Sequence, residues 1–308
     1  MMDRRPLGSS GLEVSRLSLG SWRTFERIGR EDGLAVMRAA RENGCNFLDD
    51  ARYDDETGHA PISTGYSEVL FGELFRAAGW DRAATVVANK LWWEFWPRQS
   101  AAQELDASLQ RMRLEYVDLI YANPPPEGLA VDELVAAMGE LVASGKARAW
   151  GIVNWQAEPF LELAKAAAEQ GVPAPCSAQL PYSLAGRDWV ESPEMTAALR
   201  ASGAGVVASF VIAGGVLTGK YDAGGTGRAA NEIDDLRFVA ARERGRQLRA
   251  LADELGRSPA ALAIAFALAN SAVASVLFGA TSPGQVADNV AALDIPPAVV
   301  KRVLAIAP

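Results

Sequence analysis

The sequence predicts a (β/α)8 TIM barrel, and three observations lead to that prediction. The 308-residue chain alternates short apolar runs with amphipathic segments along its whole length. Most of the runs are apolar throughout, as expected for parallel strands that are buried on both faces. No Gly-x-Gly-x-x-Gly pattern follows the first run, which disfavours the alternative, a doubly wound open sheet. Barrels of about 250 residues fold as one unit, so we expect a single domain over residues 1–308.

The apolar runs give the expected strand bounds. The eight expected strands are Arg16–Gly20, Asn46–Ala51, Thr85–Lys90, Val117–Asn123, Ala147–Asn154, Pro175–Pro181, Gly205–Phe210 and Val273–Gly279. The helices are expected at Arg30–Asn43, Ser67–Ala78, Ser100–Met112, Val131–Ser144, Pro159–Gln170, Ser192–Ser202, Asp235–Leu255, Pro259–Ala269 and Gly284–Leu293. We therefore expect extra helices after strand seven and at the C-terminus, with a β-hairpin before the first strand.

Capping residues support these bounds. The pairs Ser258-Pro259 and Ser282-Pro283 place a proline in the first turn of a helix. Gly44 and Gly145 lie just past two helix ends, where a left-handed cap favours glycine. The segment Tyr221–Ile233 is rich in glycine and polar residues, and we expect it to form a mobile loop.

Composition and charge exclude several classes of function. The net charge is −8 and the pI about 4.9, which argues against a nucleic-acid partner. Two cysteines, Cys45 and Cys176, and one histidine, His59, favour neither a disulfide framework nor a metal site. Met1–Pro6 lacks an apolar signal core, so we expect a cytoplasmic protein. The apolar stretch Ala260–Ala280 is interrupted by polar residues, and we interpret it as helix, turn and strand rather than a membrane span.

Polar residues stand where the apolar strands end. In chain order they are Asp49, Asp50, Lys90, Asn123, Asn154, Gln179, Ser209 and Gly279. In a (β/α)8 barrel these ends meet at the face that carries the active site. A lysine that ends a buried strand needs a nearby carboxylate, and only one of the two aspartates can face it, for which we favour Asp49. A Lys–Asp pair beside a tyrosine is expected to lower the pKa of the phenol and make it a general acid.

Several motifs resemble those of the aldo-keto reductases, and they follow the family's order from about Arg5 to Leu293. They are the hairpin-like Pro6–Ser15, Asn46-Phe47-Leu48-Asp49, Val87-Ala88-Asn89-Lys90, and Gly279-Ala280-Thr281-Ser282 followed by Gln285, Asp288 and Asn289. Within this superfamily, the segments Leu114–Asp118, Ala122-Asn123 and Gly219-Lys220-Tyr221 are most similar to the potassium-channel beta subunits and their bacterial relatives.

The resemblance implies an NAD(P)H-dependent oxidoreductase that reduces an aldehyde or ketone carbonyl to an alcohol. It implies catalytic roles for Asp49, Tyr53, Lys90 and Asn123, with the tyrosine as proton donor. It implies that the cofactor is held by Asn154, Gln179, Phe210, Lys220, Arg228, Gly279, Thr281, Gln285, Asp288 and Asn289. The family usually uses NADPH, and NADH is a possibility here because Asp288 would disfavour a 2′-phosphate that it faced.

The chain departs from the family pattern in the catalytic region. The family's histidine falls at Asn123, which can donate an N–H to a carbonyl oxygen but cannot carry a charge, so slow turnover or a narrow substrate range is expected. Tyr53 comes four residues after Asp49, where the family spacing is five. The alternatives are Tyr66 as proton donor, or no catalytic tyrosine.

Aromatic residues cluster next to the expected site. Trp92, Trp93 and Trp96 follow Lys90 directly, and together with Trp22 we expect them to line a substrate pocket; the alternative is packing over the barrel rim. The ring that stacks on nicotinamide in the family falls at Ser209, and Phe210 is its expected replacement after a register shift.

Three functional hypotheses follow. The first is an NAD(P)H-dependent aldo-keto reductase that acts on a small-molecule carbonyl substrate, without a nucleic-acid or membrane partner and with homo-oligomerisation possible. The second is an NADPH-binding regulatory or sensor subunit with vestigial or very slow reductase activity. The third is a barrel enzyme, such as an isomerase or lyase, with another ligand.

Overall fold

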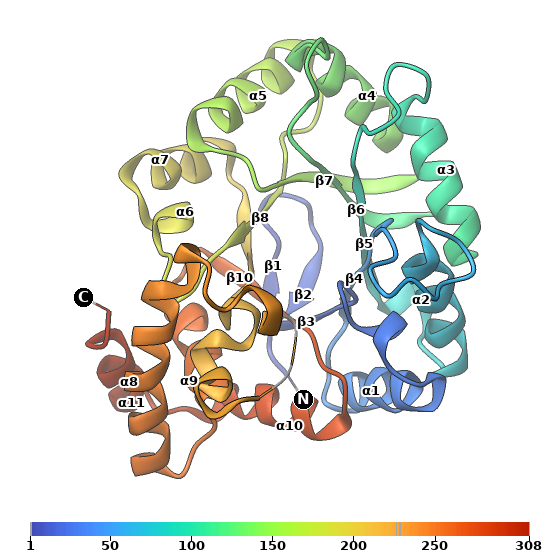
Figure 1. Ribbon diagram of the computed structural model, residues 1–308. Coiled ribbons are helices and arrows are strands. Elements are labelled where there is room, and N and C mark those ends of the chain that lie inside the picture. The colour runs from blue at the N-terminus through green and yellow to red at the C-terminus, as the bar shows by residue number, and fades with distance from the viewer. Residues whose placement is uncertain (1, 226, 228, 308) are drawn as a thin grey trace.

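The computed structural model describes residues 2–225, 227 and 229–307. Within them, eight parallel strands pair in chain order, and the last pairs with the first to close a barrel (Figure 1). The strands are β3 (Leu17–Gly20), β4 (Phe47–Asp49), β5 (Val86–Leu91), β6 (Val117–Ala122), β7 (Ala147–Val153), β8 (Ser177–Pro181), β9 (Gly205–Ser209) and β10 (Val273–Phe278). The predicted (β/α)8 barrel is confirmed, since each of these strands lies within or overlaps its predicted range.

Apolar side chains fill the barrel, and the N-terminal hairpin closes one end of it. The hairpin consists of β1 (Arg4–Pro6) and β2 (Glu13–Ser15), which pair antiparallel. Leu7, Leu12 and Val14 belong to the same buried cluster as the inward-facing barrel residues. Gly8 approaches the barrel so closely that a Cβ would lie 2.1 Å from the carbonyl oxygen of Cys176. This closure leaves the carboxyl ends of the strands as the face that is available for chemistry.

Helices surround the strands (Figure 1). The helices of the β/α repeat are α1 (Arg30–Glu42), α2 (Tyr66–Ala77), α3 (Ala101–Met112), α4 (Val131–Ala143), α5 (Ala157–Gln170), α7 (Pro193–Ser202), α9 (Pro259–Ala269) and α10 (Pro283–Val290). The further helices are α6 (Asp188–Glu191), α8 (Val239–Leu255) and α11 (Pro297–Leu304). The extra helices expected after the seventh strand and at the C-terminus are therefore present as α8 and α11. Among the residues described, no helix is both long and apolar enough to span a bilayer.

The structure differs from the prediction in two segments. Strand β4 ends at Asp49, two residues before the predicted end, because the chain turns and Tyr53 N–H bonds back to the Ala51 carbonyl at 2.9 Å. The short helix α6 was not predicted. The segment Tyr221–Ile233 contains 3-10 turns that overlap it at Lys220–Ala223 and Ala230–Glu232, and its mobility stays a prediction.

The packing of α2 against the end of α3 leaves no room for a side chain at Gly72. A Cβ there would lie 2.0 Å from the backbone oxygen of Met112. Gly72→Ala is expected to lower the free energy of unfolding by about 2 kcal/mol or more, because a backbone atom has to move. Gly284→Ala in α10 is the matched control, since its Cβ would meet nothing nearer than 3.8 Å. Urea denaturation of both variants checks this, and equal stabilities would contradict the packing argument.

Candidate active site

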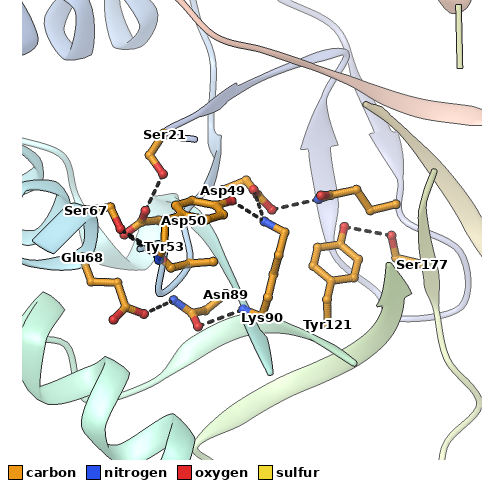
Figure 2. Close-up of polar contacts among 12 residues, drawn as sticks. Ser21, Asp49, Asp50, Tyr53, Ser67, Glu68, Asn89, Lys90, Tyr121 and Ser177 are labelled. Carbon is orange, nitrogen blue, oxygen red and sulfur yellow. Dashed lines mark hydrogen bonds and ion pairs between the residues drawn. The ribbon is translucent and has the colours of Figure 1, made fainter. Parts of the chain in front are cut away.

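A buried ion pair lies at the carboxyl ends of β4 and β5. Lys90 Nζ donates to Asp49 Oδ1, and the two residues are only 4% and 1% exposed (Figure 2). Neighbouring strands β4 and β5 are in register with Asp49 opposite Ala88, which brings the two side chains to the same end of the barrel. Gln179, in the middle of β8, donates through Nε2 to the other carboxylate oxygen of Asp49 at 2.8 Å. Both oxygens of the buried carboxylate therefore have a donor.

Tyr53 completes this group. Lys90 Nζ donates to the Tyr53 hydroxyl oxygen at 3.2 Å, so one ammonium contacts both the carboxylate and the phenol (Figure 2). The turn at Ala51–Tyr53 and a bond from Gly65 N–H to the Tyr53 carbonyl, at 2.8 Å, hold the tyrosine in place. Tyr66 is the first residue of α2, and among the described contacts none joins it to Lys90. The structure thus brings Tyr53, rather than Tyr66, to the lysine.

Burial and the neighbouring charges together set the pKa values of Tyr53 and Lys90. Burial raises the pKa of the Tyr53 phenol above its usual value, and the Lys90 charge opposes this only in part. Burial lowers the pKa of the Lys90 ammonium, but Asp49 and Tyr53 together outweigh it, and the net pKa is raised. The expectation that the pair would lower the phenol pKa is therefore wrong as a net effect. The lysine does lower it, but the loss of solvent is the larger influence.

The two adjacent aspartates face opposite ways. Asp50 is fully buried, and its Oδ1 accepts a hydrogen bond from Ser21 Oγ (Figure 2). Its Oδ2 has no partner among the described residues. Burial, followed by the nearby Glu68 charge, raises the pKa of the Asp50 carboxyl. Asp49 is the aspartate that faces Lys90, as the alternation of side chains indicated.

A polar chain behind the site was missed by the sequence analysis. Asn89 Oδ1 accepts the backbone N–H of Lys90 at 2.8 Å, and Asn89 Nδ2 donates to Glu68 Oε1 at 2.8 Å. Arg111 pairs with the other oxygen of Glu68. The sequence signal for this chain was weak. It consisted of Glu68 on the apolar face of a helical segment and Asn89 inside an apolar strand.

Asn123 lies at the same end, next to β5. Its side-chain Nδ2 donates to the Leu91 carbonyl at 2.9 Å, and its own carbonyl accepts from Trp93 Nε1 at 3.0 Å. One of the two amide N–H groups is therefore used to hold the loop, and the other has no acceptor among the residues that the structure describes.

The four tryptophans expected around a substrate differ in exposure. Trp92 packs edge-on against Tyr53, with ring centroids 6.0 Å apart and an interplanar angle of 72°. Trp22 is 38% exposed, and Trp96 is half-buried. Trp93 is only 3% exposed, so it offers almost no surface to a substrate.

The residues expected to hold a cofactor follow β7 to β10. Asn154 is exposed, and its backbone N–H donates to the Gln179 carbonyl at 3.0 Å. Phe210 is 40% exposed, with its ring 6.4 Å from that of Phe238. Lys220 Nζ lies 4.9 Å from the centroid of the Tyr221 ring. Arg228 lies outside the described residues.

The last group lies at and before the start of α10. Gly279 and Thr281 are half-buried, and the N–H and hydroxyl of Thr281 donate to Gln285 Oε1 at 2.9 and 3.2 Å. Gln285 and Asp288 are exposed, whereas Asn289 is 5% exposed and points into the fold. Of the two residues expected to form a polar helix face, Gln285 is therefore exposed and Asn289 is not.

Neither the histidine nor the cysteines join this site. His59 is exposed in the loop between Tyr53 and α2, and Cys45 and Cys176 are buried free thiols elsewhere in the fold. Among the described residues, no three His, Cys, Asp or Glu side chains are grouped so that they could hold a metal ion.

Comparison with known proteins places this geometry in a family. Residues 16–307 match the model of the aldo/keto reductase family. A probable voltage-gated potassium channel subunit beta of Oryza sativa subsp. japonica is 33% identical over 319 residues, which cover 98% of this chain and 94% of that protein. A probable voltage-gated potassium channel subunit beta of Arabidopsis thaliana is 32% identical over 325 residues, with the same coverage. The chain belongs to the aldo/keto reductase family.

Proposed function

We propose that this protein is an NAD(P)H-dependent oxidoreductase that reduces an aldehyde or ketone to an alcohol. The observation that carries the proposal is the position of Lys90 Nζ, which contacts both Asp49 and the Tyr53 hydroxyl in a buried setting. Membership of the aldo/keto reductase family supports NAD(P)H-dependent oxidoreductase chemistry in general.

The side chains divide the work as follows. The bound cofactor supplies the hydride. Tyr53 holds a proton on its hydroxyl and gives it to the carbonyl oxygen as negative charge develops there. Lys90 stabilises the resulting phenolate, because its ammonium lies 3.2 Å from that oxygen. Asp49, itself held by Gln179, keeps the ammonium charged and in place.

The residues after β10 fit a dinucleotide phosphate group. The α10 N-terminus carries Gly284, at which a Cβ would meet no heavy atom within 3.8 Å, so a ligand can approach the backbone there. The helix dipole favours an anion at this end. We propose that Thr281 and Gln285 bind beside it, with Lys220 and Arg228 reaching the phosphates. NADPH is the expected cofactor. NADH is the alternative, because Asp288 is exposed on the same helix and its carboxylate would disfavour the 2′-phosphate of NADPH if it faced that group.

The substrate is proposed to lie against the exposed aromatic surface near Tyr53. Trp22, Trp92 and Trp96 supply apolar area, and the free N–H of Asn123 supplies a donor to the carbonyl oxygen. Trp93 does not belong to this surface, because it is buried. A neutral amide stabilises a developing charge less than an imidazolium, so turnover is expected to be slow or restricted to reactive carbonyls.

An NADPH-binding regulatory or sensor subunit is the second candidate. The observation that favours it is Asn123, which cannot carry a charge, together with two relatives that are named as channel beta subunits. Under either candidate we propose a cytoplasmic protein, and a homo-oligomer is possible.

A titration distinguishes these candidates from an unrelated barrel enzyme. Tryptophan fluorescence is followed while NADPH and NADH are added, and 4-nitrobenzaldehyde is then added as a test carbonyl. Micromolar NADPH binding with turnover supports the reductase, and binding without turnover over a broad carbonyl panel supports the sensor. The absence of binding by either nucleotide would refute both.

Replacing Lys90 is expected to separate binding from chemistry. Lys90→Met removes the charge beside Tyr53, so kcat should fall by about 100-fold or more, while the Kd for NADPH changes less than threefold. Lys146→Met is the matched control, since Lys146 pairs with Asp106 on the surface. Steady-state rates and fluorescence titrations check this, and an unchanged kcat in the Lys90 variant would rule out the scheme.

The pH profile of reduction follows from the raised pKa of the half-buried Tyr53 phenol. Reduction requires protonated Tyr53, and burial raises its pKa above the usual value of about 10. The phenol therefore stays protonated through neutral pH, and kcat/KM should be constant from about pH 6 to pH 9 and decline only above that. A profile of kcat/KM that declines with a midpoint near pH 7 would contradict a Tyr53 donor held in this environment.

A further inference from the structure

Arg52 occupies the apex of the turn that carries Tyr53, and its guanidinium is almost completely buried. The side chain is 7% exposed. Nη1 donates to Thr64 Oγ1 at 2.7 Å, and Nη2 pairs with Glu94. The guanidinium carbon also lies 5.3 Å from the centroid of the Phe95 ring. We call the contacts with Thr64 and Glu94 the Arg52 bridge.

The Arg52 bridge joins two loops at the mouth of the site. Thr64 ends the hairpin loop, residues 54–64, which is closed by a bridge between Asp54 and Thr64. Glu94 belongs to the tryptophan loop, residues 92–96, which follows β5. These loops are separated by α2 and β5 in the chain. Arg52 therefore links two loops that are not adjacent in the chain.

The tryptophan loop has a second anchor beside the same guanidinium. Glu104 on α3 accepts the backbone N–H of Trp92 at 2.7 Å and that of Trp93 at 3.2 Å. Burial raises the pKa of the Glu104 carboxyl, and the two N–H bonds from Trp92 and Trp93, followed by the Arg52 charge, counter this in part. The Arg52 guanidinium thus lies near two carboxylates, those of Glu94 and Glu104. Glu94 is part of the tryptophan loop, and Glu104 holds its backbone.

The position of Tyr53 depends on both loops. Its backbone is held by the Ala51–Tyr53 turn and by Gly65, directly after the hairpin loop. Its ring packs edge-on against Trp92, and its hydroxyl accepts a hydrogen bond from the Lys90 ammonium. A shift of either loop would therefore move the phenol relative to Lys90.

We propose that Arg52 is a positioning residue for Tyr53, acting through its bridge between Thr64 and Glu94. The guanidinium fixes the turn that carries the phenol and the loop that carries Trp92. It does not touch the reacting atoms. This inference rests on the proposed function for its kinetic consequence, whereas its effect on the tryptophan loop can be measured without any turnover.

The kinetic test compares two substitutions of Arg52 with one control. In Arg52→Met, kcat for 4-nitrobenzaldehyde with NADPH should fall about tenfold, because displacements of the order of an ångström are costly in a positioned site. The Kd for NADPH should change less than twofold. Arg52→Lys keeps a cation for Glu94 and should recover kcat to within threefold of the wild type. Arg302→Met removes an exposed pair with Glu254 and should leave kcat unchanged.

Glu94→Gln keeps the test decisive if Arg52→Met does not fold. The Glu94 side chain is half exposed, so this change removes the ion pair without emptying a core position. Its kcat should fall about threefold. A kcat of Glu94→Gln equal to that of the wild type would overturn the proposal, as would equal losses in Arg52→Met and Arg302→Met.

A spectroscopic test works even if the protein proves not to be a reductase. Glu94→Gln should increase the acrylamide quenching of tryptophan emission, because the tryptophan loop opens. The same change made together with Trp92→Phe, Trp93→Phe and Trp96→Phe should produce no such increase. An increase that persists without the three tryptophans of the loop, or no increase at all, would refute the link to this loop. Lack of turnover in the wild-type protein would refute the proposed function instead.

Discussion

The ion pair between Asp49 and Lys90 is the interaction on which the rest of the site depends. A charge buried in a protein interior is costly unless a partner of opposite sign and enough hydrogen bonds satisfy it. Here Gln179 and Lys90 occupy the two oxygens of Asp49, and Tyr53 shares the ammonium. Removing any one of these residues would leave another buried polar group without its partner.

The closed barrel is what allows this pair to form. Asp49 and Gln179 are 130 positions apart in the chain, yet the strand ends meet at one face because the sheet closes on itself. The hairpin fills the opposite end, with Leu7 and Val14 in the barrel interior. The strands thus set the ion pair, while the loops after them, which Arg52 joins, set the phenol and the aromatic surface.

The sequence predicted what depends on local pattern and strand position. The apolar runs located the strands, and the polar residues toward the carboxyl ends of three of these runs were Asp49, Lys90 and Gln179. The pattern could not decide between Tyr53 and Tyr66, because the choice depends on the path of a loop. It also placed both Trp92 and Trp93 in the substrate pocket, although Trp93 is buried and Trp92 is half-buried.

Effects of burial were the least predictable. The sequence indicated that Lys90 would lower the phenol pKa, but the amount of solvent lost by Tyr53 is set by the whole fold, and it dominates. The whole fold also determines the contacts of Arg52 and the polar chain from Arg111 through Glu68 to Asn89. They join residues that are 12, 21, 42 and 43 positions apart, and no spacing rule links such positions.

The most direct test of this account is a double-mutant cycle on the buried pair, measured as free energy of unfolding in urea. Asp49→Asn and Lys90→Met should each cost about 3–5 kcal/mol, because each leaves one buried group without its partner. The account predicts that the double variant is more stable than either single variant, since neither charge then remains. Losses that simply add in the double variant would contradict it, and would mean that the two residues contribute independently.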